Sequence, residues 1–206
     1  VVLRFSDVTF GYREQQPLLN EVNFSLRERA KITLMGQNGA GKSTIFKLVL
    51  GELAPTEGAV NIRTGATIAI AAQALSKADA SKTVRVFFED AFREKVYDID
   101  PKIAKVLDAV NLHAPLTKLV SVCSGGEQAR LLLAFALIQN PDILLLDEPT
   151  NNLDKQGIAH LTKFLIEYPK TALIISHDAH FLNAITHGVL YLDVFQRKVE
   201  QYVGDY

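Results

Sequence analysis

Gly36-Gln37-Asn38-Gly39-Ala40-Gly41-Lys42-Ser43 is the stretch that decides the fold of this 206-residue chain. It follows Lys31–Met35, which is typical of a strand, and it leads into Lys42–Leu50, whose apolar residues recur at helical spacing before a C-capping Gly51. Glycines let the backbone curl so that successive N–H groups point inward, and a helix start adds positive potential there. The pattern therefore predicts a loop that binds a chain of phosphates.

The side chains of this loop have expected roles in binding a nucleoside triphosphate with Mg²⁺. Lys42 is placed to reach the β- and γ-phosphates, Ser43 to ligate Mg²⁺, and Thr44 to make a further phosphate contact. The alternative is a glycine-rich turn without function, but chance produces this pattern in only about one chain in a hundred of this size. The remaining contacts are expected from the backbone of Gly36, Asn38, Gly39 and Gly41.

A second apolar run, Ile143–Leu146, ends in the carboxylates Asp147 and Glu148. The run alone predicts a buried strand of a parallel sheet. Packing does not explain two acids at its carboxyl end, whereas ligands gather at that edge of such sheets. We therefore expect Asp147 to hold the Mg²⁺ shell and Glu148 to orient and polarise an attacking water, and we disfavour the alternative of two solvated acids.

The rest of the pattern predicts an α/β fold. Val2–Phe10 and Val22–Leu26 are β-rich, and the period-two alternation of the latter predicts an antiparallel sheet beside a largely parallel one. From Ala74 to Val122 apolar residues recur at helical spacing, as in Val84–Phe92, which predicts an inserted helical lobe. The other expected elements are strands at Ala59–Arg63, Thr67–Ala71 and Thr171–Ile175, helices at Gly125–Gln139 and Lys155–Glu167, a short helix, and edge strands at Val189–Asp193 and Lys198–Val203.

Composition indicates one ordinary globular domain. Hydrophobic residues make up 48% of the chain, charged residues 22%, and the net charge of −1 gives no global reason to expect nucleic acid or an anionic membrane as a partner. The single Cys123 excludes an internal disulfide and favours the cytoplasm. The longest apolar run, Leu131–Ile138, falls short of the roughly 20 residues of a membrane helix, and Arg4 and Asp7 argue against a signal peptide.

Ser124-Gly125-Gly126-Glu127 opens an apolar helix and has the pattern of a capping box. A capping box does not account for two glycines in the first turn, each of which costs about 1 kcal/mol of helix stability. Glycines at this place make sense where something approaches the backbone closely, such as a phosphate presented by another molecule.

The order of these motifs resembles that of ABC ATPases, and the resemblance covers essentially the whole chain. Its further marks are Leu145-Leu146-Asp147-Glu148-Pro149-Thr150 and Ser176-His177-Asp178. The resemblance implies a P-loop NTPase (RecA-like) core that binds and hydrolyses ATP with Mg²⁺. It implies a single ABC domain over 1–206, in which 1–73 and 124–206 form the core and 74–123 the helical lobe.

The resemblance also implies a second ABC domain as partner, because Ser124 and Gly126, in the signature stretch 124–127, would contact the γ-phosphate bound by that partner. Within its own site, Gln73 would sense Mg²⁺ and the attacking water, and His177 would contact the γ-phosphate. Tyr12 would stack on adenine. Each of the last three has an alternative: a loop amide, a metal site with Asp178 and His180, and a packing tyrosine, respectively.

Two further residues bear on the resemblance. Asp154 matches the family's aspartate at the interface between two domains, and it is also a plausible N-cap for the helix at Lys155. Asp178 is better explained as another N-cap than as a metal ligand. Cys123 stands where the family usually has leucine, a departure that a small apolar residue accommodates in packing.

Asn151-Asn152-Leu153-Asp154 and the closing Tyr202–Tyr206 resemble the ABC-F subfamily more than transporter subunits. That resemblance implies half of a tandem protein, in keeping with a chain that begins with Val1, and action on the ribosome or in translation by analogy alone. The alternatives are the motor subunit of a transporter and an ATP-gated scaffold that does not hydrolyse ATP.

Overall fold

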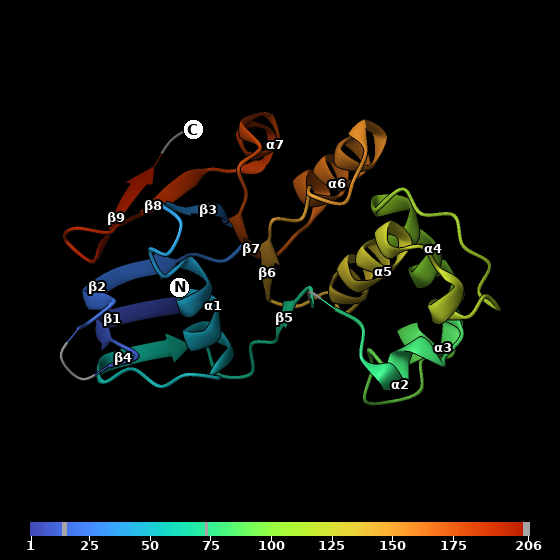
Figure 1. Ribbon diagram of the computed structural model, residues 1–206, viewed down its shortest axis with the longest axis horizontal. Coiled ribbons are helices and arrows are strands. Elements are labelled where there is room, and N and C mark those ends of the chain that lie inside the picture. Colours follow the sequence, from blue (N-terminus) through green and yellow to red (C-terminus); the bar gives the residue numbers. More distant parts are fainter. Residues whose placement is uncertain (14–15, 73, 204–206) are drawn as a thin grey trace.

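The centre of the molecule is a six-stranded sheet in the order β5-β6-β7-β3-β8-β9, beside a three-stranded sheet in the order β2-β1-β4 (Figure 1). The computed structural model describes residues 1–13, 16–72 and 74–203. The strands are β1 (Leu3–Phe10), β2 (Leu19–Leu26), β3 (Lys31–Gly36), β4 (Glu57–Ile62), β5 (Ile68–Ile70), β6 (Ile143–Asp147), β7 (Thr171–Ile175), β8 (Gly188–Asp193) and β9 (Lys198–Val203). The helices are α1 (Lys42–Leu50), α2 (Lys77–Ala80), α3 (Val84–Glu89), α4 (Asp100–Ala109), the 3₁₀ helix η1 (Val120–Val122), α5 (Gly125–Ile138), α6 (Lys155–Glu167) and α7 (Ala179–Ile185).

Both faces of the central strands β6 and β7 of the large sheet are buried, which explains the uninterrupted apolar runs of these strands. In β6, Leu144 and Leu146 belong to the hydrophobic cluster on one face, whereas Ile143 and Leu145 belong to the cluster on the other. All pairings from β5 to β8 are parallel, and β9 pairs with β8 in the antiparallel sense. The predicted fold class, an α/β fold with a largely parallel sheet, is confirmed.

The prediction that Val189–Asp193 is an edge strand is wrong. This strand, β8, lies between β3 and β9, so that of the two strands predicted to be edges, β8 and β9, only β9 is at an edge of the sheet. The misleading signal is its alternation: Leu190 and Leu192 are fully buried, but Tyr191 between them is exposed. An inner strand with one open face has the same period-two pattern as an edge strand.

The antiparallel sheet predicted from the early strands is present. β1 pairs with β2 and β4, and Phe5 of β1 stacks on Phe24 of β2 with ring centroids 4.4 Å apart. Ile45 and Phe46 of α1 share a hydrophobic cluster with these aromatic rings, so α1 packs against this sheet as well as the large one. The small sheet thereby supports the helix that follows the glycine-rich loop.

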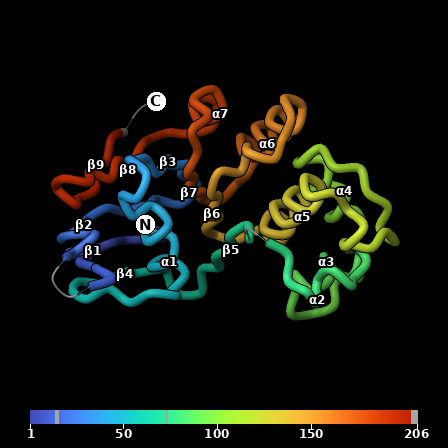
Figure 2. Tube along the Cα trace, viewed as in Figure 1, coloured from blue at the N-terminus to red at the C-terminus, as the bar shows by residue number. Residues whose placement is uncertain are grey.

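Helices α2 to α4 lie at the opposite end of the molecule from β1, β2 and β4, and the chain returns from them through α5 (Figure 2). α3 ends at Glu89, earlier than the spacing up to Phe92 predicts. The amides of Ala91 and Phe92 bond three residues back, to Phe88 and Glu89, so the chain tightens into a turn after the helix.

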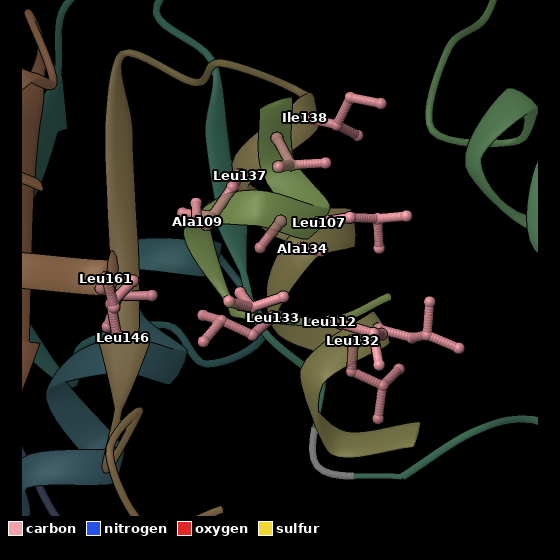
Figure 3. Close-up of a cluster of buried hydrophobic side chains, with 14 of the residues drawn as sticks. Leu107, Ala109, Leu112, Leu132, Leu133, Ala134, Leu137, Ile138, Leu146 and Leu161 are labelled. Carbon is pink, nitrogen blue, oxygen red and sulfur yellow. The ribbon is translucent and has the colours of Figure 1, made fainter. Parts of the chain in front are cut away.

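The core of these helices continues into the sheet. Leu107 of α4 and Leu132 and Leu137 of α5 share one cluster with Leu146 of β6 and Leu161 of α6 (Figure 3). Helices therefore occupy the segment predicted to be a helical lobe, while its boundaries at 74 and 123 stay a prediction. In the part of the chain that the structure describes, no helix combines the length and apolar character needed to cross a membrane.

Gly58 and Gly65 provide a matched test of backbone approach in the small sheet. Both have left-handed φ angles, 77° and 78°. A Cβ at Gly58 would lie 2.2 Å from the carbonyl oxygen of Asp7, whereas one at Gly65 would meet nothing within 4 Å. We expect Gly65→Ala to cost about 1 kcal/mol of unfolding free energy and Gly58→Ala about 3 kcal/mol or more, measured by urea unfolding. Equal losses would contradict this assignment.

Candidate nucleotide-binding and catalytic site

The glycine-rich loop connects β3 to α1 and has the geometry that its sequence requires. Gly39 and Gly41 have φ angles of 80° and 108°, in the left-handed region that favours glycine. Gly41 is the N-cap of α1 and supplies no side-chain bond to the amides of the first turn. These amides are therefore available to an anion at the start of the helix.

Lys42 folds back over this loop. Its Nζ donates hydrogen bonds to the carbonyl oxygens of Gly36 and Gln37, at 2.7 and 3.1 Å. The ammonium group therefore lies over the same turn from which the helix amides start. This position fits the predicted contact of Lys42 with phosphate.

The loop opens into a cavity of about 650 Å³. Most of the residues predicted from the sequence to bind nucleotide within one chain line it, and the full lining is Tyr12, Leu18, Asn38, Gly39, Gly41, Lys42, Ser43, Thr44, Asp147, Glu148, Asn151, Ile175 and His177. Leu18, Asn151 and Ile175 were not predicted. No motif marks Leu18, whose side chain packs beside Gly41; its place depends on how β2 folds back beside the loop.

Tyr12 stands at one side of this cavity. Its ring is 63% exposed and meets Phe10 edge-on, with centroids 5.1 Å apart. Its hydroxyl lies 3.2 Å from the hydroxyl of Thr44 at the start of α1. A largely exposed tyrosine that is held by an edge-to-face contact and by its hydroxyl fits the stacking role better than the alternative of a packing tyrosine.

Glu148 and His177 come together where β6 and β7 end. The amide of Glu148 donates to the carbonyl of Ile175 at 2.8 Å, which continues the pairing of the two strands. One carboxylate oxygen of Glu148 lies 3.3 Å from Nε2 of His177, and the other accepts from its backbone amide at 3.3 Å. Glu148 also has a left-handed φ of 49°, and such strain in a non-glycine residue is concentrated at functional sites.

Asp147 and Ser43 provide oxygen ligands of the kind that Mg²⁺ prefers. Burial raises the pKa of the Asp147 carboxyl above its usual range, and the positive charge of Lys42 opposes part of this rise. A cation beside this carboxylate would offset the cost of burying its charge. Both residues line the same cavity, so the site fits a magnesium ion bound together with phosphate oxygens.

The signature stretch, Ser124–Glu127, forms the capping box that its sequence predicts. Ser124 Oγ accepts from the amide of Glu127 at 3.3 Å, and a Glu127 carboxylate oxygen accepts from the amide of Ser124 at 2.7 Å. The Ser124 amide and then the Lys118 ammonium, 3.1 Å away, hold the pKa of Glu127 below its usual range. The box fixes the start of α5.

The two glycines of this stretch have no steric reason within the chain. A Cβ at Gly125 would meet nothing within 4 Å, and one at Gly126 would meet only a nitrogen of Arg130 at 3.9 Å. Both residues have ordinary helical backbone, without positive φ. The described residues that line the nucleotide cavity include none of 124–127, so this stretch does not serve the cavity of its own chain.

The remaining predicted residues are caps or lie elsewhere. Asp154 caps α6 by accepting from the amide of Gly157 at 2.8 Å, and Asp178 caps α7 by accepting from the amide of Phe181 at 3.0 Å, so both predicted N-caps are confirmed. Cys123 is buried, as its predicted packing role requires. Gln73 lies outside the described residues.

Comparison with known proteins identifies this arrangement. The family model described as "ABC transporter" matches residues 19–151. The ATP-binding protein YdiF of Bacillus subtilis is 36% identical over 207 residues, which are 100% of this chain and 31% of YdiF. The zinc import ATP-binding protein ZnuC of Yersinia pestis is 38% identical over 198 residues, 94% of this chain and 76% of ZnuC.

Solved structures share the fold. The ATP-binding cassette MJ0796, determined as a dimer in a post-hydrolysis state bound to ADP and Pi, superposes with a TM-score of 0.78 at 23% identity, over 98% of each chain. The chain spans about a third of the length of YdiF and most of the length of ZnuC. From its family match, its fold and the lining of its cavity, the chain belongs to the ABC family of ATPase domains.

Proposed function

We propose that this chain is one half of a head-to-tail pair of ABC domains that binds and hydrolyses Mg·ATP at two shared sites. The observation that carries the proposal is that two sets of predicted nucleotide-binding residues lie at different places in the fold. The phosphate loop, Asp147, Glu148 and His177 line one cavity, whereas the signature stretch, with Ser124 and Gly125 exposed, lies outside it. Each half would then supply the groups that the other lacks.

Hydrolysis at such a site would proceed by positioning and electrostatics. The loop amides and Lys42 would hold the β- and γ-phosphates, and Asp147 and Ser43 would hold Mg²⁺, which neutralises phosphate charge when bound. Glu148 would orient the attacking water and accept its proton. His177, 3.3 Å from Glu148, would contact the γ-phosphate and keep the carboxylate in place.

Pairing explains the two glycines of the signature stretch. Their Cα hydrogens leave open space in front of the α5 N-terminus, into which a phosphate bound by the partner could approach the backbone closely. The dimer in which MJ0796 was solved, with ADP and Pi bound, supports such a pair. Asp154 would then lie near the interface while it caps α6.

Within the family we propose an ABC-F type protein acting in translation or on the ribosome, in the cytoplasm. The support is the sequence Asn151–Asp154 and the similarity to YdiF. The similarity to ZnuC supports a second candidate, the motor subunit of a transporter. The full-length protein separates the two: a second ABC domain in the same chain supports the former, and a co-purifying membrane protein the latter.

Glu148→Gln tests the assignment of the catalytic carboxylate. We expect this variant to bind ATP, to hydrolyse it at least about a hundredfold more slowly, and to accumulate as a closed dimer, because the general base is lost while binding is kept. Phosphate release and size-exclusion chromatography measure these effects. Glu52→Gln, at an exposed position after α1, is the matched control and should keep the parent rate. Hydrolysis by Glu148→Gln at the parent rate would reject the assignment.

Gly125→Ala separates the function of the signature stretch from its stability. The added methyl meets nothing in the chain, so urea unfolding should show a gain of up to about 1 kcal/mol from helix propensity. Turnover, measured over a range of protein concentrations, should nevertheless fall at least about tenfold, because the methyl lies where the partner's phosphate approaches. Gly65→Ala should instead lower the unfolding free energy and leave turnover unchanged. Full turnover in Gly125→Ala argues against the shared site.

Tyr12 is tested by two substitutions. Tyr12→Phe keeps the ring and loses only the contact with Thr44, so ATP affinity should stay within about twofold of the parent. Tyr12→Ala should weaken binding about tenfold, because stacking on a base contributes about 1–3 kcal/mol. Calorimetric titration with ATP measures both. If Tyr12→Ala binds as tightly as the parent, the ring does not contact adenine.

A further inference from the structure

Arg130 has a buried donor that meets no acceptor among the described residues. It lies in α5, three residues after Glu127 of the capping box, and its Nε atom is inaccessible to solvent and makes no hydrogen bond within the part of the chain that the structure describes. Its guanidinium also makes no ion pair there within 4 Å. An unpaired buried donor destabilises a fold, and one that lies beside a functional site calls for an explanation.

Arg130 lines a second cavity, of about 380 Å³, together with residues of the segment after β6. This cavity shares Asp147, Glu148 and Asn151 with the nucleotide cavity. Its full lining is Ala71, Ala72, Ala129, Arg130, Leu133, Asp147, Glu148, Pro149, Asn151, Asn152 and Leu153. Arg130 therefore lines the same cavity as the residues that follow Asp147 and Glu148.

Several side-chain acceptors lie near Arg130, and most of them already have a role. Glu148 contacts His177. The backbone amide of Gly157 and, to a smaller extent, the charge of Arg130 lower the pKa of Asp154, but the Oδ1 atom of Asp154 already accepts from the Gly157 amide to cap α6. Asn151 also lines the nucleotide cavity, whereas Asn152 lines only the second cavity. The Asn152 side chain makes no hydrogen bond to other described residues, and its segment is fixed only by short turns such as that from the Leu153 amide to the Thr150 carbonyl, 3.1 Å.

We propose that Arg130 is a positioning residue whose guanidinium donates to the side-chain oxygen of Asn152 when two nucleotide-bound chains pair. The bond holds the signature end of α5 against the segment Asn151–Asp154. Both elements face the partner in the proposed pair, so this inference rests on the proposed function. Because the described residues of the single chain lack this bond and the proposed pair would contain it, the free energy of the bond would favour pairing.

This assignment and a purely structural role predict opposite changes in the stability of the single chain when Arg130 is replaced. A structural arginine stabilises the single chain, and its loss lowers the stability of that chain. Here the donor is unpaired among the described residues of the single chain, so Arg130→Met should leave the unfolding midpoint of that chain unchanged or raise it. Only the paired, ATP-bound state should lose stability.

The test is a double-mutant cycle in the Glu148→Gln background, which is expected to trap the pair. Arg130→Met, Asn152→Ala and the double variant are compared with the Glu148→Gln parent by sedimentation at saturating Mg·ATP. We expect each single substitution to raise the Kd of the pair about tenfold, and the double variant to be no weaker than either single variant. Arg93→Met, at an exposed arginine on the helical lobe without a described contact, is the control and should pair like the parent.

The outcomes are distinct. The Arg130–Asn152 bond is overturned if the increases in Kd of the two single variants multiply in the double variant, or if Arg130→Met pairs as tightly as the parent. A fall in the nucleotide-free unfolding midpoint of Arg130→Met that matches its loss of pairing overturns it as well, because a structural role explains both. If the Glu148→Gln parent itself stays monomeric with ATP, the proposed pairing fails, and this inference fails with it.

Discussion

The site depends on one constraint, that the carboxyl ends of adjacent parallel strands meet at the same edge of a sheet. The order β6-β7-β3 places three strand ends side by side, and these carry Asp147, the residues before His177, and the phosphate loop. The phosphate loop, the half-buried carboxylates Asp147 and Glu148, and His177 would be unrelated features in another strand order. Here they line one cavity. The two sheets and the helices that cover them keep these strands in register.

Features that depend on nearby residues were predictable from the sequence. The phosphate loop, the capping box of Ser124 and Glu127, and the N-caps Asp154 and Asp178 each involve residues at most a few positions apart, and the structure has them as expected. The contact of Glu148 with His177 joins residues 29 positions apart and follows from strand order, which no local pattern specifies. The same holds for Leu18 in the cavity.

The errors have local causes. The alternating sequence of β8 predicts an edge strand, but the alternation arises because one face of β8 is exposed to solvent. An inner strand with one exposed face and an edge strand have the same alternating sequence. α3 ends early because the chain tightens after Glu89, although the apolar residues continue at helical spacing. The signature glycines differ from these errors. Neither the capping box nor the packing of the chain requires glycine at 125 and 126, and this points to a surface that another molecule completes.

The shared core of the helical segment and the sheet has a mechanical consequence. Leu107 and Leu132 pack in one cluster with Leu146, the residue directly before Asp147 (Figure 3). Close-packed interiors are stiff and transmit strain rather than absorb it. A force that a binding partner applies to α4 would therefore be transmitted through these packed side chains to the end of β6, where Asp147 and Glu148 follow.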